Sequence, residues 1–308
     1  MAKVYNPKLK NVPAAFENIQ RHGHLRTYSG TTPGDEPGLP SLMATHVQGI
    51  AQNDDYIFLS HNRLGLMPTG MIAVIAKDKD KVLYWFDTPE QQHNYPHPGG
   101  IQIIGDYLVV PVETSDHDRS WIHFYDLTTM TRTKKPRKLA YSLHRETGSG
   151  AAGITNFTSA GTEYYLLAAY DNGALYFYQS NGKKLSEDGI AFSPLFDTRV
   201  RQEGYSSVCL LTDKNNGLHM IGFRTDDSNT APEDRMDLYT INIDKHSVSH
   251  EVVSRHMVTE HGGIVGPDGV HFRWGAGLRI ASDDKLKAYA TQRNFVFGTF
   301  CTNGFPPK

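Results

Sequence analysis

Two histidines stand at equivalent places in two short, similar stretches of the sequence. His46 begins HVQGI and His97 begins HPGGI, so each imidazole precedes an isoleucine by four residues. Neutral imidazole is a good ligand for zinc, iron or copper, and histidine also accepts and returns protons near neutral pH. If repeated elements bring the two stretches together, these side chains predict a site for acid–base chemistry or for a metal ion. His61 is the third histidine that we include in this prediction.

Acids and cations occupy comparable places, directly after apolar runs. Glu113 and Asp171 follow YLVVPV and YYLLAAY, and Arg224 and Arg293 follow LHMIGF and LKAYATQ. A carboxylate beside a histidine is typical of general acid–base catalysis, and an arginine holds an anionic group. The residues predicted to be catalytic are His46, His61, His97, Glu113 and Asp171. The predicted ligand contacts are Tyr205, Arg224, His271, Arg273, Trp274 and Arg293, in which the aromatic rings supply stacking surface.

The elements that must position these residues form an internal repeat. Five related stretches recur along the chain: HVQGI (46–50), HPGGI (97–101), GAAGI (150–154), GYSSV (204–208) and WGAGL (274–278). Their last apolar residues are 51, 53, 54 and 70 residues apart. A second and a third apolar run follow each stretch, and a fourth run closes four of the units. Short runs rich in β-branched and aromatic residues, separated by Gly, Asp and Asn, are typical of antiparallel strands.

Units of about 50 residues with four strands each resemble the blades of a five-bladed β-propeller. This resemblance concerns the fold, covers residues 22–305 and points to no particular family. It implies one all-β domain over residues 1–308, with blades at 46–90, 97–145, 150–200, 204–256 and 274–305. The strand 22–30 is expected to complete the last blade. Two β-sandwich domains are the alternative, but they do not account for the repeated stretches.

In such a ring, the first strand of each unit begins at the end of the central channel at which the second strand of the unit ends. We therefore expect the histidines, acids, arginines and aromatic residues to meet in a polar funnel at one end of the central channel. Two long connections, 31–45 and 260–274, enter at the same end, and long ordered loops often bind ligands or cover them. His261, in the second of these connections, and His271 are further candidates for a histidine-rich centre.

Composition and motifs exclude several classes of partner. Lys and Arg number 31 against 33 Asp and Glu, so no basic excess indicates nucleic-acid binding. No apolar run is long enough for a membrane span, and the start of the sequence lacks the apolar segment of a secretory signal. Cys209 and Cys301 both lie in apolar runs, which is typical of buried thiols in a reducing compartment. We expect a cytoplasmic monomer that binds neither nucleic acid nor membrane.

The motif GSGAAG (148–153) matches a dinucleotide fingerprint, but strands rather than a helix follow it, so no nucleotide cofactor is expected. The leading hypothesis is an enzyme of the lyase, hydrolase or isomerase type that acts on a small polar molecule through histidine and carboxylate. The cofactor stays open, with a divalent metal on His46, His61 and His97 as one candidate. The alternatives are a non-catalytic protein-interaction scaffold and a glycoside hydrolase or carbohydrate-binding propeller. Five-bladed glycosidases resemble one another in carrying acids at the starts of inner strands. This sequence has His46, His97 and Ser149 at the corresponding places, which counts against a glycosidase.

Overall fold

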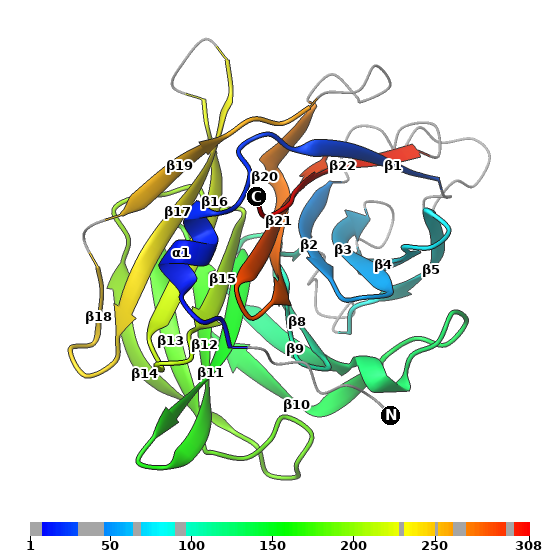
Figure 1. The fold of residues 1–308 in the computed structure, drawn as a ribbon. Helices are drawn as coiled ribbons and strands as arrows, with labels where there is room; N and C mark the ends of the chain where they lie inside the picture. The colour runs from blue at the N-terminus through cyan, green and yellow to red at the C-terminus, as the bar shows by residue number, and fades with distance from the viewer. Residues whose placement is uncertain are drawn as a thin grey trace.

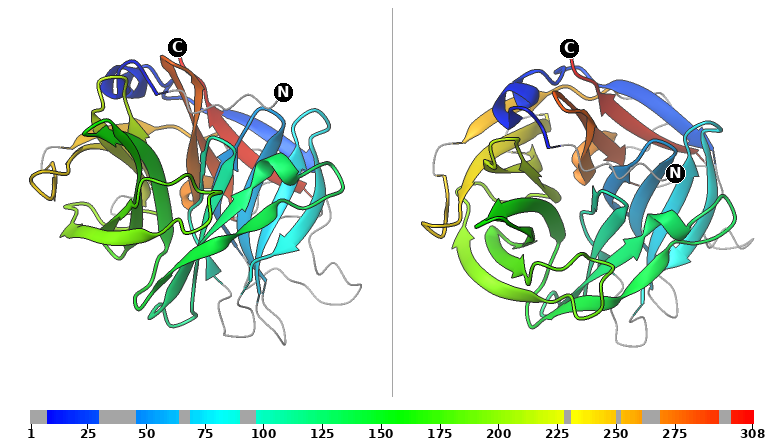
Figure 2. Two further views of the ribbon diagram at one scale, coloured as in Figure 1. Left: turned by 90° about the horizontal axis from the view of Figure 1, so that it is seen from below. Right: turned by 60° about the horizontal axis from the view of Figure 1, so that its bottom comes forward.

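The computed structural model describes residues 8–29, 46–63, 69–89, 97–227, 231–249, 252–260, 269–293 and 299–308. Within these ranges the chain is all-β, with 22 strands. The short helix α1 (Val12–Glu17) and the short 3-10 helix η3 (Leu127–Thr129) accompany them. The sheets stand around a common axis, so the molecule has the shape of a ring (Figures 1 and 2). This arrangement confirms the predicted propeller-like, all-β fold.

The strands follow one another as antiparallel meanders. The first meander contains β2 (Val47–Gln52), β3 (Tyr56–Arg63), β4 (Thr69–Ala76) and β5 (Lys81–Asp87). The second contains β6 (His97–Pro98), β7 (Gln102–Ile104), β8 (Tyr107–Glu113), β9 (Ser120–Asp126) and β10 (Arg137–Arg145), and both β6 and β7 pair with β8. The third contains β11 (Ala151–Ser159), β12 (Thr162–Asp171), β13 (Ala174–Ser180) and β14 (Phe192–Arg199).

The remaining strands form one further meander and the region that joins the two ends of the ring. The fourth meander contains β15 (Ser207–Thr212), β16 (Leu218–Asp226), β17 (Glu233–Asn242), β18 (Ser247–Val248) and β19 (Val253–Met257), and β18 and β19 both pair with β17. After it come β20 (Val270–Ser282), β21 (Lys285–Gln292) and β22 (Thr299–Phe305). The strand β1 (His24–Ser29) pairs with β22 over six residue pairs, although the two are far apart in sequence (Figure 1).

The core lies between neighbouring sheets, which explains why many strands read as continuous apolar runs. In β3, Ile57 and Leu59 face a cluster that includes Tyr289 of β21, whereas Phe58 faces a cluster with Val110 of β8. All of these side chains are at most 8% exposed. Since burying a large apolar side chain contributes about 1.5–3 kcal/mol, packing on both faces holds each sheet between its two neighbours.

Glycines allow the inner strands to approach one another closely at the axis. A Cβ at Gly99 would lie 2.1 Å from the carbonyl oxygen of Gly150, and a Cβ at Gly277 would lie 1.9 Å from that of Ile50. Gly100 exchanges backbone hydrogen bonds with the neighbouring inner strand, donating to Gly150 at 2.9 Å and accepting from Ala152 at 3.0 Å. The recurring glycines of the sequence repeat therefore serve close packing at the axis.

A buried glutamine connects inner strands from three meanders. The Gln102 side chain donates to the carbonyl of Leu210 at 2.9 Å and accepts from the backbone amides of Ile154 and Leu210 at 2.8 and 3.0 Å. These bonds join β7, β11 and β15 across the ring. The helix α1, which the sequence pattern did not indicate, places Val12 and Phe16 against β16, β20 and β22 in the largest apolar cluster. Among the described residues, no helix is long and apolar enough to cross a bilayer.

Candidate functional site

The starts of the inner strands and the ends of the strands paired with them lie at one end of the ring. This follows from the antiparallel register, in which His97 pairs with Glu113, Val47 pairs with His61, and Val270 pairs with Gln292. The predicted catalytic and ligand-binding residues are therefore all carried to the same end. The structure divides them into two groups with different partners.

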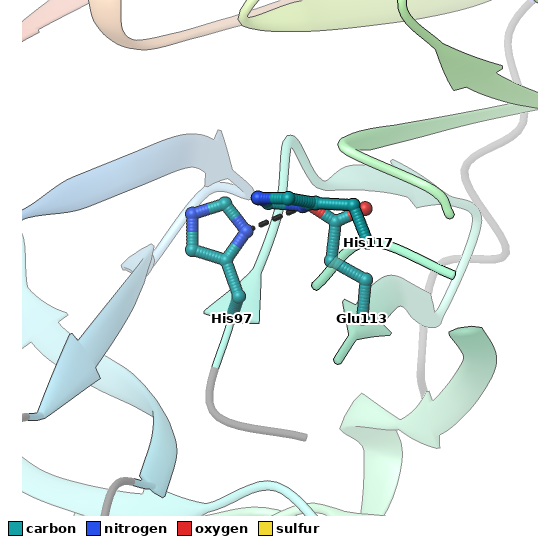
Figure 3. Close-up of side chains that lie close together, drawn as sticks. All are labelled: His97, Glu113 and His117. Carbon is teal, nitrogen blue, oxygen red and sulfur yellow. Dashed lines mark hydrogen bonds and ion pairs between the residues drawn. The ribbon is translucent and has the colours of Figure 1, made fainter. Parts of the chain in front are cut away.

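The first group centres on Glu113, the last residue of β8, which is only 2% exposed. Its Oε1 accepts hydrogen bonds from Nδ1 of His97 and from Nδ1 of His117, each at 2.7 Å (Figure 3). Its Oε2 accepts the backbone N–H of Ser149 at 2.8 Å. Both carboxylate oxygens are thus engaged, and one buried acid orients two imidazoles.

An amide connects the same group to the neighbouring meander. Nε2 of Gln48, on β2, contacts both Nε2 of His46 and Nε2 of His97. The two imidazole rings lie 5.7 Å apart between centroids. The two amide protons of Gln48 fit two imidazoles that each present an unprotonated Nε2, with the proton on Nδ1. We refer to His46, Gln48, His97, Glu113 and His117 as the Glu113 cluster.

The charges in the Glu113 cluster follow from burial and from these contacts. Burial acts to raise the pKa of Glu113, but the hydrogen bonds and charges of His97 and His117 outweigh it, so its pKa lies below the usual value. Burial, with smaller contributions from His97 and Arg293, lowers the pKa of His46 to about 4. At neutral pH the cluster therefore holds an ionised carboxylate and a neutral His46.

Asp171, at the end of β12, adjoins the cluster across Gly148. A Cβ at Gly148 would lie 3.0 Å from Oε2 of Glu113 and 3.4 Å from Cγ of Asp171, so the two carboxyl groups flank this glycine. Burial first, and then the charge of Glu113, raise the pKa of Asp171, while Arg145 opposes the rise. The two acids thus have pKa values shifted in opposite directions, an arrangement typical of acid–base sites.

His61 lies beside the cluster but faces the interior. Its ring packs edge-on against Trp85 at 5.5 Å between centroids, and the residue is 4% exposed. Burial, followed by the nearby His46, lowers the pKa of His61 to about 3. Of the five residues predicted to be catalytic, the structure therefore brings together His46, His97, Glu113 and Asp171, and places His61 behind them.

The second group of predicted residues comes from the segment before β15, from β16 and β20, and from the end of β21. Arg224 donates from Nε to Oδ2 of Asp237 at 2.8 Å, and the hydroxyl of Tyr205 donates to the same oxygen at 2.8 Å. Burial and the charge of Asp237 raise the pKa of Tyr205. Asp237 is fully buried, and the Arg224 side chain is only 12% exposed. These two predicted ligand contacts therefore have strong partners within the protein.

A second acid of β17 holds His271 in a similar way. Asp234 accepts from Nδ1 of His271 at 2.9 Å and from the backbone N–H of Phe272 at 2.9 Å. The hydroxyls of Thr225 and Thr259 also donate to this carboxylate, at 2.7 and 3.0 Å. His271 is thereby fixed at the start of β20.

Three of the predicted residues form a stack, which we call the Trp274 stack. The guanidinium groups of Arg273 and Arg293 each lie 4.9 Å from the centre of the Trp274 ring. Arg273 also donates to both carboxylate oxygens of Asp227 at 2.8 Å. Arg293 connects the two groups, because its charge acts on His46 and its carbonyl accepts the N–H of Val47 at 2.8 Å. Within the described part of the chain, Nε1 of Trp274 is buried and has no hydrogen-bond partner.

Sequence reasoning missed Gln48 and His117. His117 lies in the turn between β8 and β9, four residues after Glu113 and at a φ of 59°. The connection between second and third strands belongs to the end of the ring where we expected the site, so a search of these turns would have found it. Gln48 carries no charge and gave no comparable signal. The predicted loop 31–45 and the part of the second loop at 261–268, with His261, lie outside the described residues.

Comparisons with known proteins name no family. No family model matches the chain, and no curated protein matches it. Among solved structures, the chain is similar to the beta-propeller domain of the Trilobed protease from Pyrococcus furiosus, with 10% identity and a TM-score of 0.32. The match covers 82% of this chain and 78% of that chain, and it is a likeness of the fold alone.

Proposed function

We propose that the end of the ring carrying the Glu113 cluster binds a small polar molecule and performs acid–base chemistry on it. The observation that carries this proposal is the buried carboxylate of Glu113, which receives Nδ1 of both His97 and His117 at 2.7 Å. A carboxylate in this position fixes the orientation and the tautomer of an imidazole and leaves Nε2 of His117 to exchange protons, whereas Nε2 of His97 contacts Gln48. The His117 side chain is 53% exposed and that of His97 is 21% exposed, so a ligand can reach them.

The roles of the residues follow from their surroundings. His117 is the proton acceptor, because its Nε2 lies on the ring edge opposite Glu113. Asp171, whose pKa is raised by burial and by Glu113, is the proton donor. The Trp274 stack provides two guanidinium groups for an anionic part of the ligand. Lyase, hydrolase and isomerase reactions all use such a set of groups.

The distances favour acid–base chemistry over a metal centre in this cluster. His97, Glu113 and His117 each offer one ligand atom within 4.8 Å of the others. However, bonds of about 2.0–2.2 Å to a shared tetrahedral ion separate its ligands by roughly 3.3–3.5 Å. The two Nδ1 to Oε1 distances of 2.7 Å are those of hydrogen bonds, so an ion at this place requires the three side chains to move apart. Elemental analysis of the purified protein decides between these cases.

Glycoside hydrolysis has weaker support. Glu113 and Asp171 flank Gly148, which would suit a pair of catalytic carboxyl groups. Yet both oxygens of Glu113 already accept hydrogen bonds from His97, His117 and Ser149. A nucleophilic or proton-donating role for Glu113 would break these bonds, whereas an orienting role uses them.

The test combines a ligand screen with one variant and one control. Wild-type protein, His117→Gln and His144→Gln are screened by thermal shift against hydroxy acids, amino acids and monosaccharides, and stabilising compounds are followed by NMR for conversion. His144 is the control because it is an exposed histidine on β10, and β9 separates this strand from β8. We expect a compound that stabilises wild type and His144→Gln and that loses its effect with His117→Gln. Equal binding and turnover by wild type and both variants contradict the proposal. If no small molecule binds and only partner proteins do, the scaffold alternative is favoured.

We also propose that the ring consists of five four-stranded blades, the last closed by β1. The support comes from the eight-stranded sheet, whose order is β2-β3-β4-β5-β1-β22-β21-β20. Its two halves are joined between β5 and β1 by one parallel pair, Ser29 with Lys81, whereas β1 and β22 share six antiparallel pairs. Dividing the sheet at this weak junction gives one blade of β2–β5 and one of β20–β22 with β1.

A further inference from the structure

A cavity of about 410 Å³ lies at the other end of β2 from the Glu113 cluster. Gln52, the last residue of β2, lines it, together with residues of β1, β21 and β22. At about 3.3 Å per residue, the two ends of β2 are roughly 17 Å apart. The cavity shares no lining residue with the Glu113 cluster, and its volume is within the range of small-molecule sites.

A glycine keeps this cavity open. Gly304 lies on β22 between His24 of β1 and Tyr289 of β21. A Cβ at Gly304 would meet only the Tyr289 ring, at 3.6 Å and beyond, which is ordinary van der Waals contact. The position therefore tolerates a side chain, and a larger one would enter the cavity.

The lining is strongly cationic. None of the described residues that line the cavity is acidic, whereas four carry a positive charge: Arg26, Lys77, Arg279 and Lys287. Asp80 pairs with Arg26 and Asp54 pairs with Arg279, but the side chains of these acids are 46% and 74% exposed and do not line the cavity. Four cations against these two acids leave a net positive charge around the cavity, and such a charge attracts anions.

Lys77 shows how closely the cations are placed. Its Nζ donates to the carbonyl of Asn53 at 3.0 Å and lies partly buried. Burial first, and then the charges of Arg279, Lys287 and Arg26, lower the pKa of Lys77 to about 8, although Asp54 acts in the opposite direction. A bound anion would relieve this repulsion and raise the pKa of Lys77 again.

We propose that this cavity binds a small dianion of the phosphate monoester or dicarboxylate class. Arg26, Lys77, Arg279 and Lys287 surround its charged group, because arginine and lysine are the side chains that hold phosphate and carboxylate oxygens. The Tyr289 ring supplies apolar surface for the carbon part of the ligand. This site is independent of the function proposed for the Glu113 cluster.

The proposal is tested by titration calorimetry at constant ionic strength. The probes are inorganic phosphate, glucose 6-phosphate and succinate, with glucose as the neutral comparison. We expect saturable binding of at least one dianion and none of glucose, and the better dianion identifies the class. Lys287→Gln and Gly304→Leu should each weaken this binding at least tenfold, the first by removing a charge and the second by filling the cavity.

A matched control distinguishes an effect of a charge at the cavity from an effect of the overall charge of the protein. Lys285→Gln removes the same charge from the same strand, but Lys285 does not line the cavity. This variant should bind as the wild type does. Equal weakening by Lys285→Gln and Lys287→Gln, or no saturable binding of any dianion, overturns the proposal.

A second readout concerns protons and does not depend on the stability of the variants. At pH 8 the binding of a dianion should draw a proton to Lys77, so the measured heat should change with the ionisation enthalpy of the buffer. Lys77→Gln should remove this buffer dependence. A heat that is the same in all buffers with the wild-type protein contradicts the position assigned to the anion.

Discussion

The carboxylates of Glu113 and Asp237 are almost equally buried, but their partners differ in kind. Glu113 holds the imidazoles of His97 and His117, and the second of these is half-exposed. Asp237 holds the guanidinium of Arg224, whose side chain is 12% exposed, and the buried hydroxyl of Tyr205. A guanidinium keeps its proton at any ordinary pH, whereas an imidazole exchanges it. The same burial thus produces a fixed structural contact on β17 and a site able to move protons on β8.

The largest expected effect is on stability and concerns Asp237. Asp237→Ala removes the closer of two carboxylates that Arg224 contacts, Asp237 at 2.8 Å and Asp226 at 3.5 Å, and leaves the largely buried guanidinium poorly paired, which should lower the free energy of unfolding by about 3–5 kcal/mol. Urea denaturation measures this loss, and Asp237→Asn should show a smaller one because it keeps an acceptor for Tyr205. A loss below about 1 kcal/mol for Asp237→Ala would remove the contrast between the two acids.

The next effect is on function and concerns Glu113. In Glu113→Gln, one oxygen is replaced by an amide nitrogen that donates and the negative charge is lost, so either the two imidazoles or the backbone N–H of Ser149 lose their acceptor. We expect turnover or ligand affinity to fall about 100-fold, within the usual contribution of general acid–base groups. The free energy of unfolding should fall by only about 1–3 kcal/mol. The control is Glu146→Gln, which changes a side chain that is 80% exposed.

The outcome for Glu113→Gln separates two roles. Normal turnover with a large loss of stability would make Glu113 a structural acid like Asp237. The opposite pattern, in which function falls much more than stability, supports the proposed site.

A third effect is the dependence of stability on pH. The pKa values of His46 and His61 are lowered, mainly by burial, to about 4 and about 3, from about 6.5 in an unfolded chain. Below pH 6.5 the unfolded chain therefore binds protons that the folded protein excludes. The free energy of unfolding should fall by about 1.4 kcal/mol per pH unit for each histidine, down to the folded pKa. Above pH 6.5 this effect is absent.

Glu113 adds to acid sensitivity at lower pH, since its lowered pKa stabilises the fold only while the carboxylate is ionised. Urea denaturation between pH 8 and pH 5 measures the histidine contribution apart from that of Glu113. His61→Gln should reduce the slope by about one proton, whereas His144→Gln should leave it unchanged. An unchanged slope with His61→Gln contradicts the buried, neutral state of His61.

The smallest effect concerns the Trp274 stack. Arg273→Gln removes a cation from the Trp274 ring and an ion pair with Asp227, whose side chain is 59% exposed. Contacts of this kind at the surface contribute about 0.5–1 kcal/mol or less, so the melting temperature should change little. Affinity for an anionic ligand should fall more clearly. If stability falls as much as with Asp237→Ala, the stack is a structural element and not part of a binding site.

Much of the fold could be predicted because the repeat marks the inner strands. The glycines and the last apolar residue of each repeat are needed where inner strands pack closely, as Gly277 does against Ile50. The helix α1 was not predicted because six residues capped by Asn11 give only a weak helical pattern.

The site was predictable where strand register alone decides which side chains meet. His97 and Glu113 are register partners on β6 and β8, so their contact follows from the predicted sheet. His117 was missed because it lies in a turn, whose conformation the repeat does not specify. Asp237, the shared partner of Tyr205 and Arg224, was missed because it lies on a third strand. Nothing in the local sequence indicates that its side chain points toward these two residues. The cytoplasmic location and the monomeric state stay predictions.

The pairing of β1 with β22 has a consequence for how the protein is made. Of the described strands, β1 leaves the ribosome first and β22 leaves last. At roughly 5–20 residues per second, on the order of tens of seconds separate the two. During that interval the Arg26 and Tyr28 edge of β1 has no partner strand in β22, and unpaired edges promote aggregation. The ring can therefore close only once translation has reached β22.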